Sequence, residues 1–292
     1  MKISGFTIIR NAVKNDYPIV EAITSILPVV DEMVVLIGDC NDGTEELIRS
    51  ISSPKIIIYY SVWNTQLQAG GVVLAEETNK AFQLIDPSST WAFYIQADEV
   101  IHEKYHTAIL DRCKLYKDDK RVQGLLFKYL HFYGTYKYVG DSRRWYSHEV
   151  RIIRNDKSIS AYRDAQGFRI GDKRLNVKRI EAWVYHYGWV KSQENMIAKM
   201  KNVSNYWIAD KKKSEQFMAK ENVFSFEDYD SISRFTGTHP QVMQPRIQQQ
   251  DYNLQLDVNK KKLKLKHRIM YFIEKLTGKR FFEFKNYRIV KD

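Results

Sequence analysis

Several features that would assign a protein class directly are absent from this sequence or sparse in it. Its 292 residues include two cysteines, Cys40 and Cys113. No pair of Cys or His residues stands at the spacing of metal ligands, which argues against a disulfide framework and a zinc site. We expect two free, reduced thiols, with a single disulfide as the alternative. Thirteen Gly and six Pro are too few for a fibrous or low-complexity protein.

Segments that would direct the chain into or across a membrane are also missing. No run approaches the roughly 18 apolar residues of a transmembrane helix. The first residues lead straight into a strand pattern, without the apolar core and cleavage site of a signal peptide. We therefore expect a cytoplasmic protein, with a peripheral position at the inner face of the plasma membrane left open.

Two nucleotide-binding signatures are absent as well. The turn after the first predicted strand lacks the G-x-G-x-x-G pattern, which argues against a dinucleotide-binding Rossmann site. No G-x-x-x-x-G-K-[ST] loop occurs, which excludes a P-loop nucleotidase. A nucleotide held by side chains across the strand ends remains compatible with the sequence.

What is present is enough apolar material for a folded core and a marked excess of positive charge. Hydrophobic residues make up 44% of the chain and aromatic residues 13%, which excludes a disordered protein and suits one large domain or two. The net charge of +11 indicates an anionic partner, namely nucleic acid, a membrane surface or a phosphorylated substrate.

Most of this charge lies at the C-terminal end. From Asn259 onward there are twelve Lys and Arg against three Asp and Glu, so nine of the eleven net charges belong to the tail. One helical face of the tail is apolar and carries Leu265, Ile269, Phe272, Ile273 and Leu276. Two interpretations stand: a basic amphipathic helix on an anionic membrane surface, or a helix packed on the rest of the protein with a solvated Lys face. Because the remaining chain is nearly neutral, nucleic acid is the weakest of the three partners.

The first hundred residues alternate between strand and helix patterns. Asp16 is predicted to cap the first helix, which ends before Pro28, and a later helix begins at Ser192 with an apolar stripe that ends at Trp207. The predicted strands are 3–9, 33–37, 56–60 and 91–96, and the helices between them are 19–27, 45–51 and 72–85. This alternation predicts an α/β fold with a parallel sheet covered on both faces, with ligands bound at the C-terminal ends of the strands.

Polar residues at these strand ends are the first candidates for a site, and each has a structural alternative. Asp39 and Asp42 suit hydrogen bonds to a nucleoside, or else form the turn that opens the next helix. Asp98, in Gln96-Ala97-Asp98-Glu99, suits a divalent cation, or else caps the following segment. His186, in His186-Tyr187-Gly188, is either a ligand or a structural histidine.

The combination of these motifs resembles the family-2 glycosyltransferases with a GT-A fold. Gly38-Asp39-Cys40-Asn41-Asp42-Gly43-Thr44 is similar to their D-x-S-x-D-G-T turn, and Gln96-Ala97-Asp98-Glu99 to their D-x-D motif, with Gln96 in place of the first Asp. His186-Tyr187-Gly188 is similar to a late His-Tyr-Gly found in many members, and the first strand, like theirs, ends near an Asn, Asn11. The resemblance is good over residues 3–100, fair to about 200 and absent in the tail.

The resemblance implies a Rossmann-like mixed or parallel sheet flanked by helices, with a helical C-terminal extension. It divides the chain into a nucleotide-sugar-binding half, 1–100, an acceptor-binding half, 101–224, and the extension, 225–292. It implies transfer of a sugar from a nucleoside diphosphate, with inversion and metal assistance, to a glycan or glycolipid acceptor of bacterial surface polysaccharide or glycolipid synthesis. Nucleotide contacts would come from Asn11, Asp39, Asp42, Trp63 and Gln96, and a Mn²⁺ or Mg²⁺ site from Asp98 and His186.

The catalytic base is the most open assignment. Such a transfer needs a carboxylate near the acceptor hydroxyl. Asp164 lies in a polar turn, about where relatives place an acidic residue, and Glu149 is the rival. Either one suits a structural ion pair with a nearby arginine such as Arg151. Trp63 is expected beside the nucleotide base or else closes a loop.

Two other functions compete with an active transferase. The first is a catalytically degenerate protein that binds a nucleotide sugar without transfer, because Gln96 removes a carboxylate from the metal motif. The second is a basic nucleic-acid-binding protein that uses its charge and its 19 Tyr, although no nucleic-acid-binding signature supports it.

Overall fold

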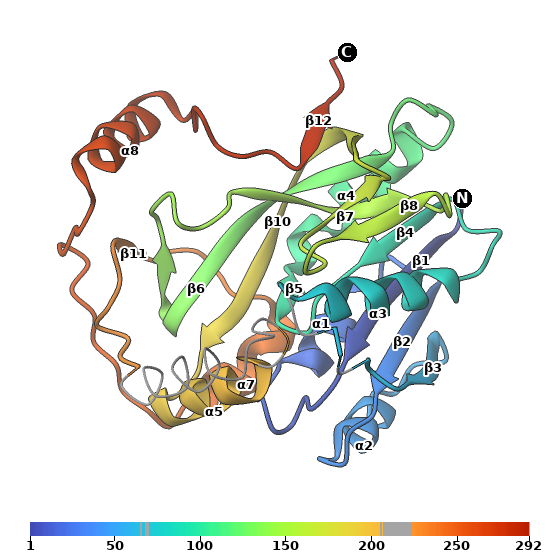
Figure 1. Ribbon diagram of the computed structural model, residues 1–292, viewed down its shortest axis with the longest axis horizontal. Coiled ribbons are helices and arrows are strands. Elements are labelled where there is room, and N and C mark those ends of the chain that lie inside the picture. The colour runs from blue at the N-terminus through green and yellow to red at the C-terminus, as the bar shows by residue number, and fades with distance from the viewer. Residues whose placement is uncertain (65, 68–69, 205, 207–223, 292) are drawn as a thin grey trace.

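The computed structural model describes residues 1–64, 66–67, 70–204, 206 and 224–291. The N-terminal part alternates strands and helices as the sequence predicts (Figure 1). These elements are β1 (Ile3–Ile9), α1 (Ile19–Ile26), β2 (Glu32–Gly38), α2 (Thr44–Arg49), β3 (Ile56–Ser61), α3 (Val72–Gln83) and β4 (Trp91–Tyr94).

Both faces of these strands are buried, because neighbouring residues of a strand point to opposite sides of the sheet. In β2, Met33, Val35 and Ile37 belong to the core cluster that includes residues of α1 and α2 on one face. Val34 and Leu36 belong to the cluster that includes residues of α3 on the other. The continuous apolar runs in the sequence therefore correspond to strands covered on both sides.

The second half adds two long strands and several short elements. They are β5 (Glu99–Ile101), α4 (His106–Leu115), β6 (Gly124–Gly140), β7 (His148–Arg154), β8 (Ile159–Tyr162), β9 (Gly167–Ile170), β10 (Lys173–Val190) and α5 (Gln193–Ser204). The C-terminal part contains β11 (Ile232–Arg234), α7 (Gln244–Gln248), α8 (Leu265–Thr277) and β12 (Tyr287–Ile289), and two 3-10 turns lie at Glu103–Tyr105 and Gln241–Met243.

The strands form one mixed sheet in the order β3-β2-β1-β4-β7-β6-β10-β9-β8. Strands β3, β2, β1 and β4 run parallel, and β7 is antiparallel to both β4 and β6. Because β4 pairs with β7, the sheet continues across the division expected at residues 100 and 101. The expected α/β fold, a mixed sheet flanked by helices with a helical C-terminal extension, is confirmed.

Three local predictions were wrong. Asp16 does not cap α1, since Pro18 precedes the helix and Asp16 has a positive φ of 48° and pairs with Arg246. The apolar run 125–132 predicts a strand that ends at Phe132, before an aromatic and basic stretch, yet β6 continues into that stretch and is 17 residues long. The polar composition of residues 225–250, with Pro240 and Pro245, predicts an irregular segment, yet it contains β11 and α7. The end of the expected stripe on α5, Trp207, lies outside the described residues.

Two further findings concern the cysteines and the character of the helices. Both cysteines are free, and Cys113 is buried. Among the described helices, none combines the length and the apolar character needed to cross a membrane.

Candidate active site

The polar segments after β1, β2 and β4 meet at one edge of the sheet. Ile9 at the end of β1 is paired with Ile37 of β2, and Phe6 with Tyr94 at the end of β4. The residues that follow these strands therefore emerge side by side, as expected for a parallel sheet. A cleft of about 500 Å³ opens there, a volume within the range of small-molecule sites.

Five of the residues singled out in the sequence line this cleft. They are Trp63, Gln96, Asp98, Asp164 and His186. The described lining also includes Tyr17, His131 and Lys199, which the sequence did not single out, and Arg144 and Trp145, which belong to the aromatic and basic stretch 133–145 whose composition suits a sugar acceptor. The structure thus brings the candidate metal residues and one candidate base into a single cavity.

Asp98 lies at the centre of a charged cluster in the cleft. Its Oδ1 is 3.7 Å from His186 Nε2, and its Oδ2 is 3.3 Å from Lys199 Nζ. Burial raises the pKa of this carboxyl, but His186, Lys199 and Lys191 outweigh burial and lower it to about 2. Asp98 is therefore an anion throughout the physiological range.

The approach of His186 to Asp98 follows from strand pairing. β5 lies antiparallel to β10, with Glu99 opposite His186, and the backbone N–H of Tyr187 donates to the carbonyl of Asp98 over 2.8 Å. Gly188 is required by this geometry, because a Cβ there would lie 2.4 Å from Asp98 Oδ2. The spacing within His186-Tyr187-Gly188 thus has a direct steric explanation.

The imidazole of His186 is largely buried, with 13% of the side chain exposed, and is incompletely paired. Burial lowers its pKa, although Asp98 and Glu99 oppose the shift. Its Nδ1 has no hydrogen-bond partner within the described part of the chain, and neither has Nδ1 of neighbouring His131. Since buried polar atoms are normally satisfied, this orphaned nitrogen is a candidate contact for a bound ligand, while Nε2 is the ring nitrogen that faces Asp98.

Glu99 has a structural role that removes it from the metal motif. Arg151 donates to both of its oxygens, over 2.8 and 2.7 Å, and Tyr129 donates its hydroxyl over 2.7 Å. Both charged side chains are fully buried. Glu99 is the nearest carboxylate in the sequence that could replace the one missing at Gln96, but its position in a closed ion pair makes it unsuited to hold a metal ion.

The two candidate bases lie in different surroundings. Asp164 lines the cleft from a turn in which Arg163 and Ala165 have positive φ angles of 57° and 61°. The turn is tied to the end of β4, because Gln96 donates its amide to the carbonyl of Ala165 over 3.3 Å. Burial raises the pKa of Asp164.

Glu149 belongs to the interior of the sheet and is outside the residues that line the cleft. Its Oε2 has no partner among the described residues. Burial raises its pKa to about 8, with nearby Glu99 and Asp164 adding to the shift and Arg151 opposing it. Neither Glu149 nor Asp164 forms the arginine pair considered from the sequence, because Arg151 binds Glu99.

Two lysines near Asp98 were missed by the sequence analysis. Lys199, on α5, donates to Asp98 and, over 3.0 Å, to the carbonyl of Gly188, and its ammonium lies 4.7 Å from the Tyr17 ring centre. Lys191 is buried, and desolvation lowers its pKa to about 7. The only sequence signal for either residue was its position shortly after His186.

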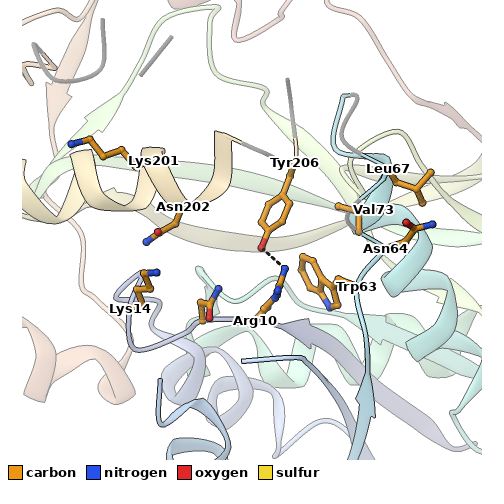
Figure 2. Close-up of a pocket in the computed structure, with 10 residues that line it drawn as sticks. Arg10, Lys14, Trp63, Asn64, Leu67, Val73, Lys201, Asn202 and Tyr206 are labelled. Atoms are coloured by element: carbon orange, nitrogen blue, oxygen red, sulfur yellow. Dashed lines mark hydrogen bonds between the residues drawn. The ribbon is translucent and has the colours of Figure 1, made fainter. Parts of the chain in front are cut away.

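A second pocket of about 320 Å³ adjoins the cleft and shares Arg10, Trp63 and Tyr206 with it (Figure 2). Tyr206 points toward Arg10, which donates to its hydroxyl over 3.3 Å, and the Tyr206 and Trp63 ring centres are 5.3 Å apart. Its polar lining also includes Asn11, Lys14, Asn64, Lys201 and Asn202. We refer to it as the Trp63 pocket.

Asp39 and Asp42 form hydrogen bonds to residues that line or flank the Trp63 pocket. Asp39 accepts from the Arg10 guanidinium over 2.7 Å and from the Trp63 backbone N–H over 3.0 Å. Asp42 accepts from the backbone N–H of Lys14 over 2.8 Å and from the Thr44 hydroxyl. Neither is among the described residues that line the two cavities. In this structure Asp39 and Asp42 therefore act as positioning residues, which hold the segments that form the pocket.

The cleft lacks a preformed multidentate metal site. Within the part of the chain that is described, no group of three or more His, Cys, Asp or Glu side chains is arranged to hold a metal ion. Asp98 and His186 supply one carboxylate and one imidazole, and any further ligands would have to come from a substrate or from water.

No protein-family model and no curated protein sequence matches this chain. Among solved structures, it is similar to Staphylococcus aureus TarS, with 14% identity over 76% of this chain and a TM-score of 0.38, and it spans 43% of that chain. A shorter piece of TarS in complex with UDP has 15% identity and a TM-score of 0.38, over 76% of this chain and 71% of that one.

A third similar structure is glucosyl-3-phosphoglycerate synthase from Mycobacterium tuberculosis in complex with Mn²⁺, UDP and phosphoglyceric acid. It has 19% identity and a TM-score of 0.30, and the match covers 44% of this chain and 43% of that chain. What the cleft does chemically therefore has to be argued from its own side chains.

Proposed function

We propose that this chain is a glycosyltransferase that moves a sugar from a nucleoside diphosphate to an acceptor hydroxyl. The observation that carries the proposal is the charged cluster of Asp98, His186 and Lys199 in a strand-end cleft that also contains Asp164. Such a transfer requires stabilisation of a leaving diphosphate and a base for the incoming hydroxyl, and the cleft has candidates for both.

The donor nucleoside is proposed to occupy the Trp63 pocket. An aromatic pair, Trp63 and Tyr206, offers faces on which a base stacks, and Arg10 and Asn11 offer polar groups beside them. Asp39 holds Arg10 and Trp63 in position rather than contacting the base. Because the pocket opens into the cleft through shared residues, the diphosphate of a bound donor would extend toward Lys199 and Asp98.

The residues around Asp98 could hold a divalent cation if the diphosphate of the substrate supplied the remaining ligands. Asp98 and His186 would hold it, since Oδ1 of Asp98 and Nε2 of His186 face each other over 3.7 Å. Mg²⁺ and Mn²⁺ are commonly held by one or two protein groups plus phosphate oxygens, which suits this donor set. When bound, the ion would stabilise the negative charge of the leaving diphosphate. Lys199 supplies a further positive charge from the protein itself.

Asp164 is proposed to be the base. Burial raises its pKa, which makes the carboxylate a better proton acceptor than an exposed aspartate. Direct attack of an activated hydroxyl on the sugar would invert its anomeric centre.

The acceptor would lie along the wall formed by Arg144 and Trp145, where aromatic and cationic groups suit a glycan or an anionic glycolipid. Bacterial surface polysaccharide or glycolipid synthesis is the setting that we propose.

A thermal-shift panel of nucleoside diphosphates and their sugars, with and without Mn²⁺, tests the proposal. We expect one nucleotide to raise the melting temperature, with a further increase in Mn²⁺. Asp98→Ala should abolish the Mn²⁺-dependent increase, whereas Asp172→Ala, which changes an exposed turn residue, should retain it.

Three outcomes would separate the alternatives. An unchanged Mn²⁺-dependent increase in Asp98→Ala would refute the metal assignment. Nucleotide-sugar binding without turnover would indicate a degenerate binding protein. Salt-dependent binding of random oligonucleotides, with no nucleotide-dependent shift, would indicate a nucleic-acid-binding protein instead.

A further inference from the structure

Helix α8 presents its apolar face to solvent. Leu265, Ile269, Phe272 and Leu276 recur at intervals of three or four residues and therefore share one face. Their side chains are between 53% and 76% exposed. A helix that packs on a globular core normally buries such a face, so the orientation of α8 needs another explanation.

The opposite face of α8 is attached to the protein by polar contacts. Tyr271 donates its hydroxyl to Asp141 over 2.7 Å, and Glu274 accepts from Arg143 over 3.2 Å. Arg280, just beyond the helix, donates to Glu274 over 2.9 Å and to the carbonyl of Trp145. These contacts hold the helix with its apolar side outward, at the edge of the molecule far from α2 and α3 (Figure 1).

The segment after α8 extends this apolar surface. Phe282 is 95% exposed and has a positive φ of 58°, which marks it as the tip of a turn. Phe281 and Phe284 on either side are exposed as well. Soluble proteins rarely leave so many large apolar side chains together on the surface without a partner.

The charge around this surface identifies the kind of partner. Lys264, Lys266 and Arg268 are exposed within or directly before the first turn of α8, and Lys279 and Lys285 are exposed around the three phenylalanines. A surface that combines aromatic and aliphatic side chains with cations complements an interface that is apolar beneath and anionic above. The headgroup region of a bilayer with acidic lipids has this character.

We propose that α8 and residues 281–284 form a docking surface for an anionic lipid bilayer. The helix would lie in the plane of the interface, with its apolar side chains at the acyl boundary and its cations among the headgroups. This agrees with the finding that no described helix is suited to cross a membrane. The inference is independent of the proposed transferase reaction, since binding is measured without turnover.

Co-flotation of the full chain with vesicles tests the proposal. We expect binding to phosphatidylcholine vesicles that contain phosphatidylglycerol, weaker binding to phosphatidylcholine alone, and loss of binding at high salt. A variant with Phe272→Ser and Phe282→Ser should bind the mixed vesicles at least about tenfold more weakly, because two large apolar contacts are lost. A variant with Lys264→Glu, Lys266→Glu and Arg268→Glu should be weaker by a similar factor at low salt.

Matched controls change similar residues elsewhere on the surface. Leu115 on α4 is 61% exposed, so Leu115→Ser removes an exposed apolar side chain away from the docking surface. Lys114→Glu with Lys120→Glu reverses two exposed charges in the same region. Both controls should bind like the wild type, and urea unfolding of every variant should establish that the fold is intact.

Three results would overturn the proposal. One is undiminished vesicle binding by folded Phe272→Ser, Phe282→Ser protein. Another is equal binding to vesicles with and without phosphatidylglycerol. The third is a concentration-dependent dimer that those two substitutions dissociate, in the absence of vesicle binding, which would assign the face to a second copy of the chain.

Discussion

Glu149→Gln should change the pH dependence of stability in a way that follows from the burial of this carboxyl. In the folded protein its pKa is raised from the ordinary value of 4.5 to about 8. Its protonated form is therefore favoured by folding. The stabilisation from this site is complete below about pH 4.5 and is lost as the pH rises through 8. Gln resembles the protonated acid and does not titrate, so it avoids this loss.

The size of the effect follows from the same shift. At about 1.4 kcal/mol per pH unit, the change from 4.5 to about 8 sets a ceiling of about 5 kcal/mol. Relaxation of the structure around a newly charged Glu149 makes the real effect smaller than this ceiling. We therefore expect the free energy of unfolding of Glu149→Gln to exceed that of the wild type by about 2–5 kcal/mol at pH 8.5. The free energies of unfolding of the two proteins should be nearly equal near pH 4.5.

Urea unfolding at a series of pH values measures this difference. The wild type also contains buried His131 and half-buried His148, whose pKa values are lowered mainly by burial. Their titration is common to both proteins and cancels in the comparison. A difference in unfolding free energy that stays flat between pH 5 and 8.5 would refute the assignment of Glu149 as a buried, protonated acid. If folded Glu149→Gln protein loses glycosyl transfer, Glu149 rather than Asp164 would be the candidate for the catalytic base.

Two further predictions concern the cleft and the ion pair behind it. Asp164→Asn should lower glycosyl transfer by at least about 100-fold, because the base is lost, while nucleotide binding in the thermal-shift assay is retained; surviving turnover would exclude Asp164 as the base. Glu99→Gln should destabilise the fold by about 3–5 kcal/mol, since it leaves the Arg151 guanidinium buried without its carboxylate. Adding Arg151→Met to this variant should restore most of the lost free energy of unfolding, as measured with urea. If Glu99→Gln alone costs less than about 1 kcal/mol, the ion pair contributes little to stability.

Much of the N-terminal fold could be predicted from the sequence because its signals are local. The apolar run Ile3–Ile9 matches β1 residue for residue, the prediction for β2 is one residue short at each end, and the prediction for β3 is one residue short at its C-terminal end. Helix boundaries were less accurate where capping depends on distant partners. Asp16 looked like an N-cap but pairs with Arg246, which is 230 residues away in the chain.

The candidate site was predictable to the extent that it depends on strand ends. Asp98 and His186 were singled out by their positions after apolar runs, and the pairing of β5 with β10 brings them to 3.7 Å of each other. Lys199 and Arg151 carried no comparable signal. Each meets a carboxylate only because packing places α5 and β7 beside the segment that follows β4.

The sequence by itself determined the alternation of strands and helices, the polar edge where the parallel strands end, and the basic amphipathic character of the tail. These follow from periodicity, chain direction and composition, all of which are local properties. Only the tertiary structure decided that Glu99 is neutralised by Arg151, that Glu149 is buried away from the cleft, and that α8 attaches by its polar face. Such pairings depend on which side chains exclude water from each other, and residues distant in sequence meet only once the chain has packed.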